Sequence, residues 1–154
     1  MVHEELYDVG MWERTMEGRR SGQLADVVAQ PAAKLLVRSP ANRDSDEFVA
    51  MVAAALEGVY EATHSSLSGL VEISATGVTK ASGVAWVAAR LGIEADDVVV
   101  FGDMPNDVPM LAWAGRAVAV ANAHPTVKQV ADEVTASNDD DGVAVWLERE
   151  LGSL

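Results

Sequence analysis

The sequence predicts an α/β fold, in which a parallel sheet is covered by helices, together with a smaller α+β unit. In residues 77–154, short runs rich in valine and alanine alternate with segments of helical periodicity. This alternation is typical of a parallel sheet with helices on its faces. Hydrophobic residues make up 49% of the chain but aromatic residues only 5%. Small apolar side chains therefore supply much of the core volume, which favours helices packed on a valine-rich sheet over an all-β sandwich.

In the second half of the chain, the spacing of apolar residues predicts the helices and strands, and glycine and proline residues predict where they end. Val84, Val87, Ala88 and Leu91 share one face of a predicted helix over residues 80–91. The apolar run at residues 98–101 predicts a buried parallel strand. The remaining predicted elements are a helix from about residue 107 to 114, a strand over 116–121, a helix beginning at Pro125, a strand over 132–135 and a helix from about residue 141.

Residues 31–75 predict a different order of elements, namely strand, helix, strand and strand. The strands are expected at 34–38, 59–64 and 70–74, with the helix capped by Asp44, Ser45 or Asp46 and ending at Gly58. Such an order predicts an α+β unit with a largely antiparallel sheet. We place the boundary near residue 76, which divides the chain into domains of 1–76 and 77–154.

Composition excludes several classes of partner. The 24 acidic and 11 basic residues give a formal net charge of −13, and such a surface repels nucleic acids and anionic membranes. The chain has no cysteine, so thiolate metal sites and disulfides are excluded. No apolar stretch approaches the length of a membrane span, and the first residues lack the pattern of a secretory signal. We therefore expect a cytoplasmic protein.

The most informative motif follows the strand at 98–101. Asp103 comes where this buried strand opens into a loop, at the edge where open α/β sheets bind ligands, and Asp107 comes four residues later. Hard oxygen ligands at this spacing suit a Mg²⁺ ion that also holds a phosphate. Asn106 offers amide donors to a phosphate oxygen. The alternative interpretation is a turn aspartate, a helix cap and a turn asparagine.

Lys80 is the second candidate. It stands at the head of the predicted helix 80–91, where the helix dipole disfavours a cation. A bound phosphate would resolve this conflict, since the ammonium and the amide groups would then face the same anion. The alternative is a solvated surface lysine. The histidines (His3, His64 and His124) are scattered and are expected to be structural or surface residues, and the tryptophans (Trp12, Trp86, Trp113 and Trp146) are expected to pack in the core.

Together, five segments resemble the haloacid dehalogenase superfamily, in its Cof-type branch of phosphatases for sugar phosphates and other small phosphates. The segments are residues 77–80 (GVTK), 102–111 (GDMPNDVPML), 118–123 (VAVANA), 131–135 (ADEVT) and 138–143 (NDDDGV). The resemblance covers residues 77–151 and implies a Rossmann-like parallel core, of which this chain holds a part. Residues 31–76 resemble the latter part of the α+β cap of that branch.

The resemblance also implies roles for the candidate residues. Asp103 and Asp107 match the acids that bind Mg²⁺, Lys80 matches the lysine that neutralises the phosphate and the aspartyl-phosphate intermediate, and Asn106 matches a phosphate contact. The nucleophile of the family is an aspartate in an Asp-x-Asp-x-Thr motif, and these 154 residues contain no such motif. The chain by itself is therefore expected to be inactive.

The leading hypothesis is the C-terminal portion of a Mg²⁺-dependent phosphatase acting on small phosphorylated metabolites. Such a chain is expected to form a homo-oligomer or to pair with a missing N-terminal half, because its sheet would otherwise have exposed edges. The alternative is a non-catalytic binding or oligomerisation domain that keeps the fold. A receiver-like phosphoacceptor domain is disfavoured, because the acidic pocket of an early strand is lacking.

Overall fold

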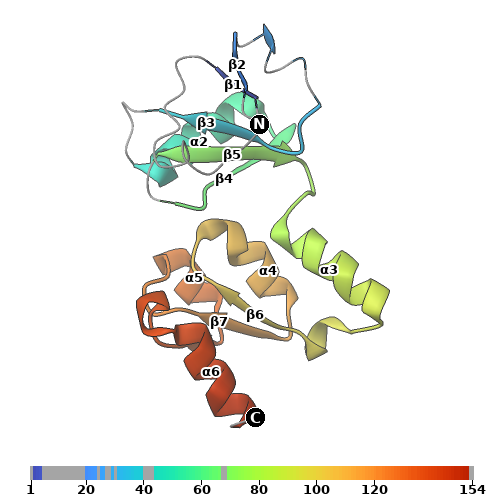
Figure 1. Cartoon of the computed structure of the whole chain (residues 1–154), viewed down its shortest axis with the longest axis vertical. Coiled ribbons are helices and arrows are strands. Elements are labelled where there is room, and N and C mark those ends of the chain that lie inside the picture. Colours follow the sequence, from blue (N-terminus) through green and yellow to red (C-terminus); the bar gives the residue numbers. More distant parts are fainter. Residues whose placement is uncertain are drawn as a thin grey trace.

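The computed structural model describes residues 2–4, 20–23, 25–26, 29, 31–39, 44–66 and 69–152. Figure 1 shows two groups of elements, one above the other, connected by the segment between β5 and α3. We call the group from β3 to β5 the N-terminal unit and the group from α3 to α6 the C-terminal unit. The predicted domain ranges, 1–76 and 77–154, stay a prediction.

The N-terminal unit has the predicted order of strand, helix, strand and strand. Its elements are β3 (Leu35–Arg38), α2 (Ser45–Leu56), β4 (Tyr60–Thr63) and β5 (Leu70–Ala75). The three strands form an antiparallel sheet in the order β3-β5-β4. Asp44 caps α2, because its side chain accepts a hydrogen bond from the Glu47 N–H at 2.9 Å. Two short strands, β1 (Val2–Glu4) and β2 (Arg20–Gly22), form a separate parallel pair.

The C-terminal unit is a parallel sheet with helices packed against it, as predicted. Its strands are β6 (Val99–Gly102), β7 (Arg116–Ala119) and β8 (Glu133–Val134), in the order β6-β7-β8. Its helices are α3 (Lys80–Leu91), α4 (Val108–Trp113), α5 (Pro125–Val130) and α6 (Gly142–Leu151). Short 3-10 turns over Ala95–Asp97, Pro105–Asp107 and Asn138–Asp140 connect them.

Small aliphatic side chains fill the core of this unit. The core residues come from β6 and β7, from the segment between β7 and α5, and from α4 and α5; they are Val100, Leu111, Ala117, Ala119, Val120, Ala123 and Val127. Trp146 of α6 is also buried, and its ring meets that of Phe101 edge-to-face at 5.3 Å between centroids. The strands thus bring the ends of β6 and β7 to one edge, where the candidate site lies.

The expectation that all four tryptophans pack in the core is wrong for Trp86. Its side chain is 63% exposed on α3, and the Arg90 guanidinium lies 4.8 Å from its ring centroid. Helical spacing alone does not decide which face of α3 meets the core. Trp12 lies outside the described residues. Across the described chain, no helix is both long enough and apolar enough to cross a bilayer.

Candidate active site

The candidate site is the loop that leaves β6, which we call the acid loop and define as residues 103–107. It begins directly after Gly102. A glycine is required there, because the side chains of Asp107 and Leu111 lie close to its backbone. A Cβ atom at this position would lie 2.9 Å from Asp107 Cβ and 2.9 Å from Leu111 Cδ1. Any larger residue would therefore push the acid loop away from the sheet edge.

Asp107 organises this loop from within. Its side chain is buried, and its Oδ2 accepts hydrogen bonds from the backbone N–H groups of Asp103 at 3.0 Å and Met104 at 3.1 Å. Its Oδ1 pairs with the Lys80 ammonium. Both carboxylate oxygens therefore have donors, which is what a buried carboxylate requires. The side chain of Asp107 caps the acid loop, not the helix α4 that follows it, and its pairing with Lys80 joins α3 to the loop.

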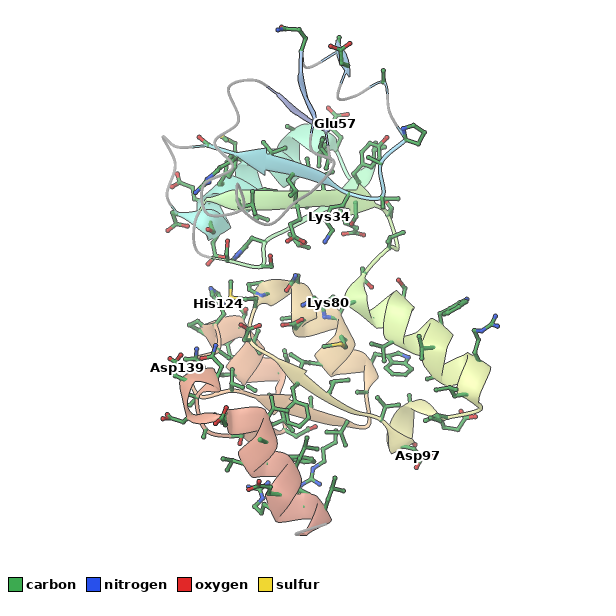
Figure 2. The ribbon with its side chains drawn as sticks, viewed as in Figure 1. Lys34, Glu57, Lys80, Asp97, His124 and Asp139 are labelled. Atoms are coloured by element: carbon green, nitrogen blue, oxygen red, sulfur yellow. The ribbon has the colours of Figure 1, made fainter. Side chains whose placement is uncertain are left out.

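Lys80 lies at the start of α3, between the two units. Thr79 begins the helix with a reciprocal capping box to Ser82, which fixes where Lys80 emerges. The Lys80 side chain remains 48% exposed although it pairs with Asp107. Figure 2 shows Lys80 and His124 at the edge of the C-terminal unit that faces the N-terminal unit. Half of the lysine is thus still accessible to a ligand at this edge.

The N-terminal unit adds further charge near Lys80. Glu72 of β5 accepts hydrogen bonds from Lys34 Nζ and from Ser65 Oγ, each at 2.5 Å. Burial works to raise the pKa of Glu72, but these two donors and the positive charges of Lys34 and Lys80 outweigh it and lower the pKa. Glu72 is therefore held ionised within the electrostatic reach of Lys80.

Asp103 has a different environment from Asp107. It is exposed, and its backbone C=O accepts a hydrogen bond from the His124 N–H at 2.8 Å. Partial burial raises the pKa of Asp103 above 3.8, and the nearby negative charge of Asp107 raises it further, against the opposing charge of Lys80. Two acids close together with one lysine leave a local excess of negative charge. A bound cation would relieve it.

These residues fit a hard divalent cation. The oxygens of Asp103 and Asp107 are the ligand type that Mg²⁺ prefers. The Asn106 side chain is buried, and its Oδ1 has no hydrogen-bond partner among the described residues, which leaves it open to a group outside them. Within the described ranges, no cluster of three or more His, Asp or Glu side chains could hold a metal. By themselves, the described residues would therefore supply only part of a coordination shell, and Mg²⁺ commonly keeps several waters.

All four site residues predicted from the sequence thus lie in one region. Lys80 and Asp107 touch, Asp103 is joined to Asp107 through its N–H, and Asn106 lies in the same loop. Their roles toward metal and phosphate stay predictions. His64 and His124, which are scattered in the sequence, also come together at this edge, where both meet Asp46. No local signal predicts this contact, because the three residues come from distant parts of the chain.

Comparison with known proteins agrees with this architecture. Phosphoglycolate phosphatase of Methanopyrus kandleri is 42% identical over 93 residues, which span 54% of this chain and 40% of that protein. The 5-amino-6-(5-phospho-D-ribitylamino)uracil phosphatase YcsE of Bacillus subtilis is 42% identical over 84 residues, spanning 54% of this chain and 33% of that protein. The structure of the HAD subclass IIB sugar phosphatase BT4131 has the same fold, with a TM-score of 0.73 and 23% identity over 86% of this chain and 48% of its own.

The chain thus spans less than half the length of these three proteins. The family model for haloacid dehalogenase-like hydrolases matches residues 20–147, which include the N-terminal unit, most of the C-terminal unit and every candidate site residue. This match confirms the resemblance to the haloacid dehalogenase superfamily that the motifs predicted, and the structural neighbours share the fold. The chain belongs to the haloacid dehalogenase-like hydrolase family.

Proposed function

We propose that this chain supplies the phosphate-binding and metal-binding part of a Mg²⁺-dependent phosphatase that acts on small phosphorylated metabolites, such as sugar phosphates. The observation that carries the proposal is the cluster of Lys80, Asp107 and Asp103 at the carboxyl end of β6. An accessible ammonium beside two acids suits a phosphoryl group that arrives with a divalent cation. The phosphatase names of the two relatives in sequence support the same reaction.

In this proposal the residues of the chain have distinct tasks. Lys80 holds a phosphoryl oxygen by charge-assisted hydrogen bonds, and Asn106 donates to a second oxygen from its side-chain amide. Asp103 and Asp107 would hold the cation, while Asp107 also keeps Lys80 in place. When bound, Mg²⁺ acts as a Lewis acid that offsets charge on the phosphoryl oxygens.

The covalent step needs a nucleophile, which we propose comes from outside this chain. The attacking carboxylate forms an aspartyl-phosphate as the alcohol leaves, and water then hydrolyses the acyl-phosphate. The absence of Asp-x-Asp-x-Thr from the 154 residues supports this assignment. So does the sheet, since β6 pairs only with β7 among the described strands, which leaves its other edge open to a further strand.

A thermal-shift titration tests the binding proposal. Mg²⁺ and inorganic phosphate together should raise the Tm of the chain, because a ligand that binds the folded state stabilises it by mass action, by about 2.7 kcal/mol at 100 times its Kd. Asp103→Asn and Lys80→Met should each abolish most of the shift. Asp97→Asn is the matched control, since Asp97 lies in the 3-10 turn before β6, away from the site (Figure 2).

The second candidate is a non-catalytic domain that uses the same fold for binding or oligomerisation. The exposed apolar side chains of α3, Trp86 and Leu91, favour it. It predicts no stabilisation by Mg²⁺ and phosphate, and indifference to Lys80→Ala. A phosphatase assay adds a separate check: vigorous turnover by the chain alone, lost in Asp103→Asn, would show that the nucleophile lies within these residues.

A further inference from the structure

Three side chains far apart in the sequence meet between the two units. Asp46 lies in the first turn of α2, His64 directly follows β4, and His124 precedes α5. His64 Nε2 lies 2.8 Å from Asp46 Oδ1, and His124 Nε2 lies 3.2 Å from Asp46 Oδ2. We call these three residues the interunit bridge. One carboxylate thus contacts an imidazole from each unit.

Further hydrogen-bond partners hold both rings in place. His64 is 1% exposed, and its Nδ1 lies 3.1 Å from the Ser66 carbonyl oxygen, so both ring nitrogens face oxygen atoms. The His64 ring is thus fixed from two sides. His124 Nδ1 instead accepts from the Thr126 N–H at 3.3 Å, which places the ring proton on Nε2, toward Asp46.

Asp46 therefore accepts from an N–H group of each ring, because a carboxylate has no proton to donate. The hydrogen bond from His64 lowers the pKa of Asp46 against a smaller effect of burial, and His124 lowers it further. The two rings meet edge-to-face with centroids 6.1 Å apart. The Asp46 side chain is nevertheless 61% exposed, and exposed ion pairs are individually weak. Such a contact can open and close.

The position of the bridge relates it to the candidate active site. The His124 backbone N–H donates to the Asp103 carbonyl oxygen at 2.8 Å, so the residue that Asp46 holds is itself bonded to the acid loop. We propose that Asp46 is a reversible positioning residue, which holds the N-terminal unit closed over the acid loop by bonding His64 and His124 at once. This role concerns the arrangement of the units and does not depend on the proposed phosphatase activity.

A distance measurement between the units tests the role of Asp46. The chain has no cysteine, so spin labels on Ala53→Cys in α2 and Gln129→Cys in α5, both exposed positions, are the only thiol labels. Pulsed electron resonance on the full chain should give one narrow distance population. Asp46→Asn should replace it with a broader and longer one. Glu47→Gln removes the same charge from the same helical turn but from a side chain that contacts neither histidine, and should leave the population unchanged.

A second variant covers the case in which Asp46→Asn fails to fold. His124→Ser keeps a side-chain oxygen to cap α5 but is too short to reach Asp46, and it should open the units in the same way.

Two results would overturn the proposal. They are a parent-like distance population in Asp46→Asn or in a folded His124→Ser, and equal broadening in Glu47→Gln. None of these readouts involves Mg²⁺, phosphate or turnover. A negative distance result would therefore overturn the role of Asp46 without touching the proposed phosphate and metal binding. A negative thermal-shift result would do the reverse.

Discussion

Asp107 shows how one buried side chain can be both a structural cap and part of a functional site. Its two oxygens accept from Asp103, Met104 and Lys80, so that the acid loop, β6 and the start of α3 depend on a single carboxylate. An acid in the first turn after a strand is commonly interpreted as a cap. Here the capping carboxylate of Asp107 also holds the Lys80 ammonium in position. The structural and functional interpretations of Asp107 are compatible.

Asp107→Asn should destabilise the chain by about 2 kcal/mol, the scale of losing hydrogen bonds to a charged group. The asparagine keeps the size of the side chain but removes its charge. The NH₂ group of the asparagine cannot accept a hydrogen bond, as the carboxylate oxygen in its place does. Urea unfolding measures the change, with Asp97→Asn as the control for an exposed acid in a 3-10 turn. Equal stability of the two variants would show that the bonds of Asp107 contribute nothing.

Asp103→Asn should instead stabilise the metal-free chain at neutral pH. Burial and the charge of Asp107 raise the pKa of Asp103, so the folded state binds its proton more tightly than the unfolded state. Stability therefore falls as the pH rises from the unfolded pKa, near 3.8, through the raised folded pKa. Above that window the ionised carboxylate costs free energy, and the asparagine avoids the cost.

Thermal unfolding of Asp103→Asn and the parent chain across this pH range checks the sign. The gain should be largest at neutral pH and should vanish at acid pH, where the parent carboxyl is protonated in both states. A variant that is less stable than the parent at neutral pH without metal would contradict the raised pKa. Saturating Mg²⁺ with phosphate should reverse the order, because only the parent keeps the ligand.

At the scale of elements, a close backbone approach holds the beginnings of β6 and β7 together. Gly115, between α4 and β7, donates its N–H to the Ala95 carbonyl oxygen at 2.8 Å. A Cβ atom at this position would lie 2.3 Å from the Asp96 carbonyl oxygen, which belongs to backbone and cannot turn aside. The 3-10 turn before β6 is thus packed directly on the start of β7.

Gly115→Ala should therefore cost about 1–3 kcal/mol, as overpacking does in a close-packed region. Gly83→Ala is the matched control, because Gly83 lies within α3 and an added Cβ would meet nothing within 4 Å. That substitution should stabilise the chain by about 0.5–1 kcal/mol, the difference in helix preference between alanine and glycine. Circular dichroism melts of the two variants should shift in opposite directions, and a shift in the same direction would contradict the packing argument.

At the scale of the molecule, β6 leaves one edge of the parallel sheet unpaired among the described strands. Val99 on this strand is 40% exposed, and β6 has a single neighbour among the described strands. Unpaired edges with apolar side chains favour pairing with another chain. We expect the chain to self-associate through this edge or to accept a strand from a complementary polypeptide.

Sedimentation velocity over a range of concentrations measures the association. Val99→Lys should shift the distribution toward the monomer, since a lysine on an edge strand opposes edge-to-edge pairing. Val134→Lys is the control, because Val134 is a similarly exposed valine on β8 at the opposite side of the sheet. A monomer at every concentration, or an equal effect of the two lysines, would show that β6 is not the associating edge.

Much of the fold was predictable because its signals are local. The bounds of α3 agree with the predicted 80–91, since Thr79 caps its start and Gly92 adopts the left-handed conformation (φ 69°) at its end. The cap of α2 at Asp44 and the strand before Gly102 were likewise predictable from a few neighbouring residues. These signals depend on residues within one helical turn or one strand of each other.

Lys80 and Asp107 lie 27 positions apart, yet they were predicted to share a site, because both match motifs of the family that the chain resembles. The sequence by itself thus determined the order of elements, the family and the candidate residues. Only the tertiary structure decided that Asp107 faces Lys80, that Trp86 faces solvent and that Asp46 joins His64 to His124. Such contacts depend on how whole elements pack against each other, and local spacing carries no information about that packing.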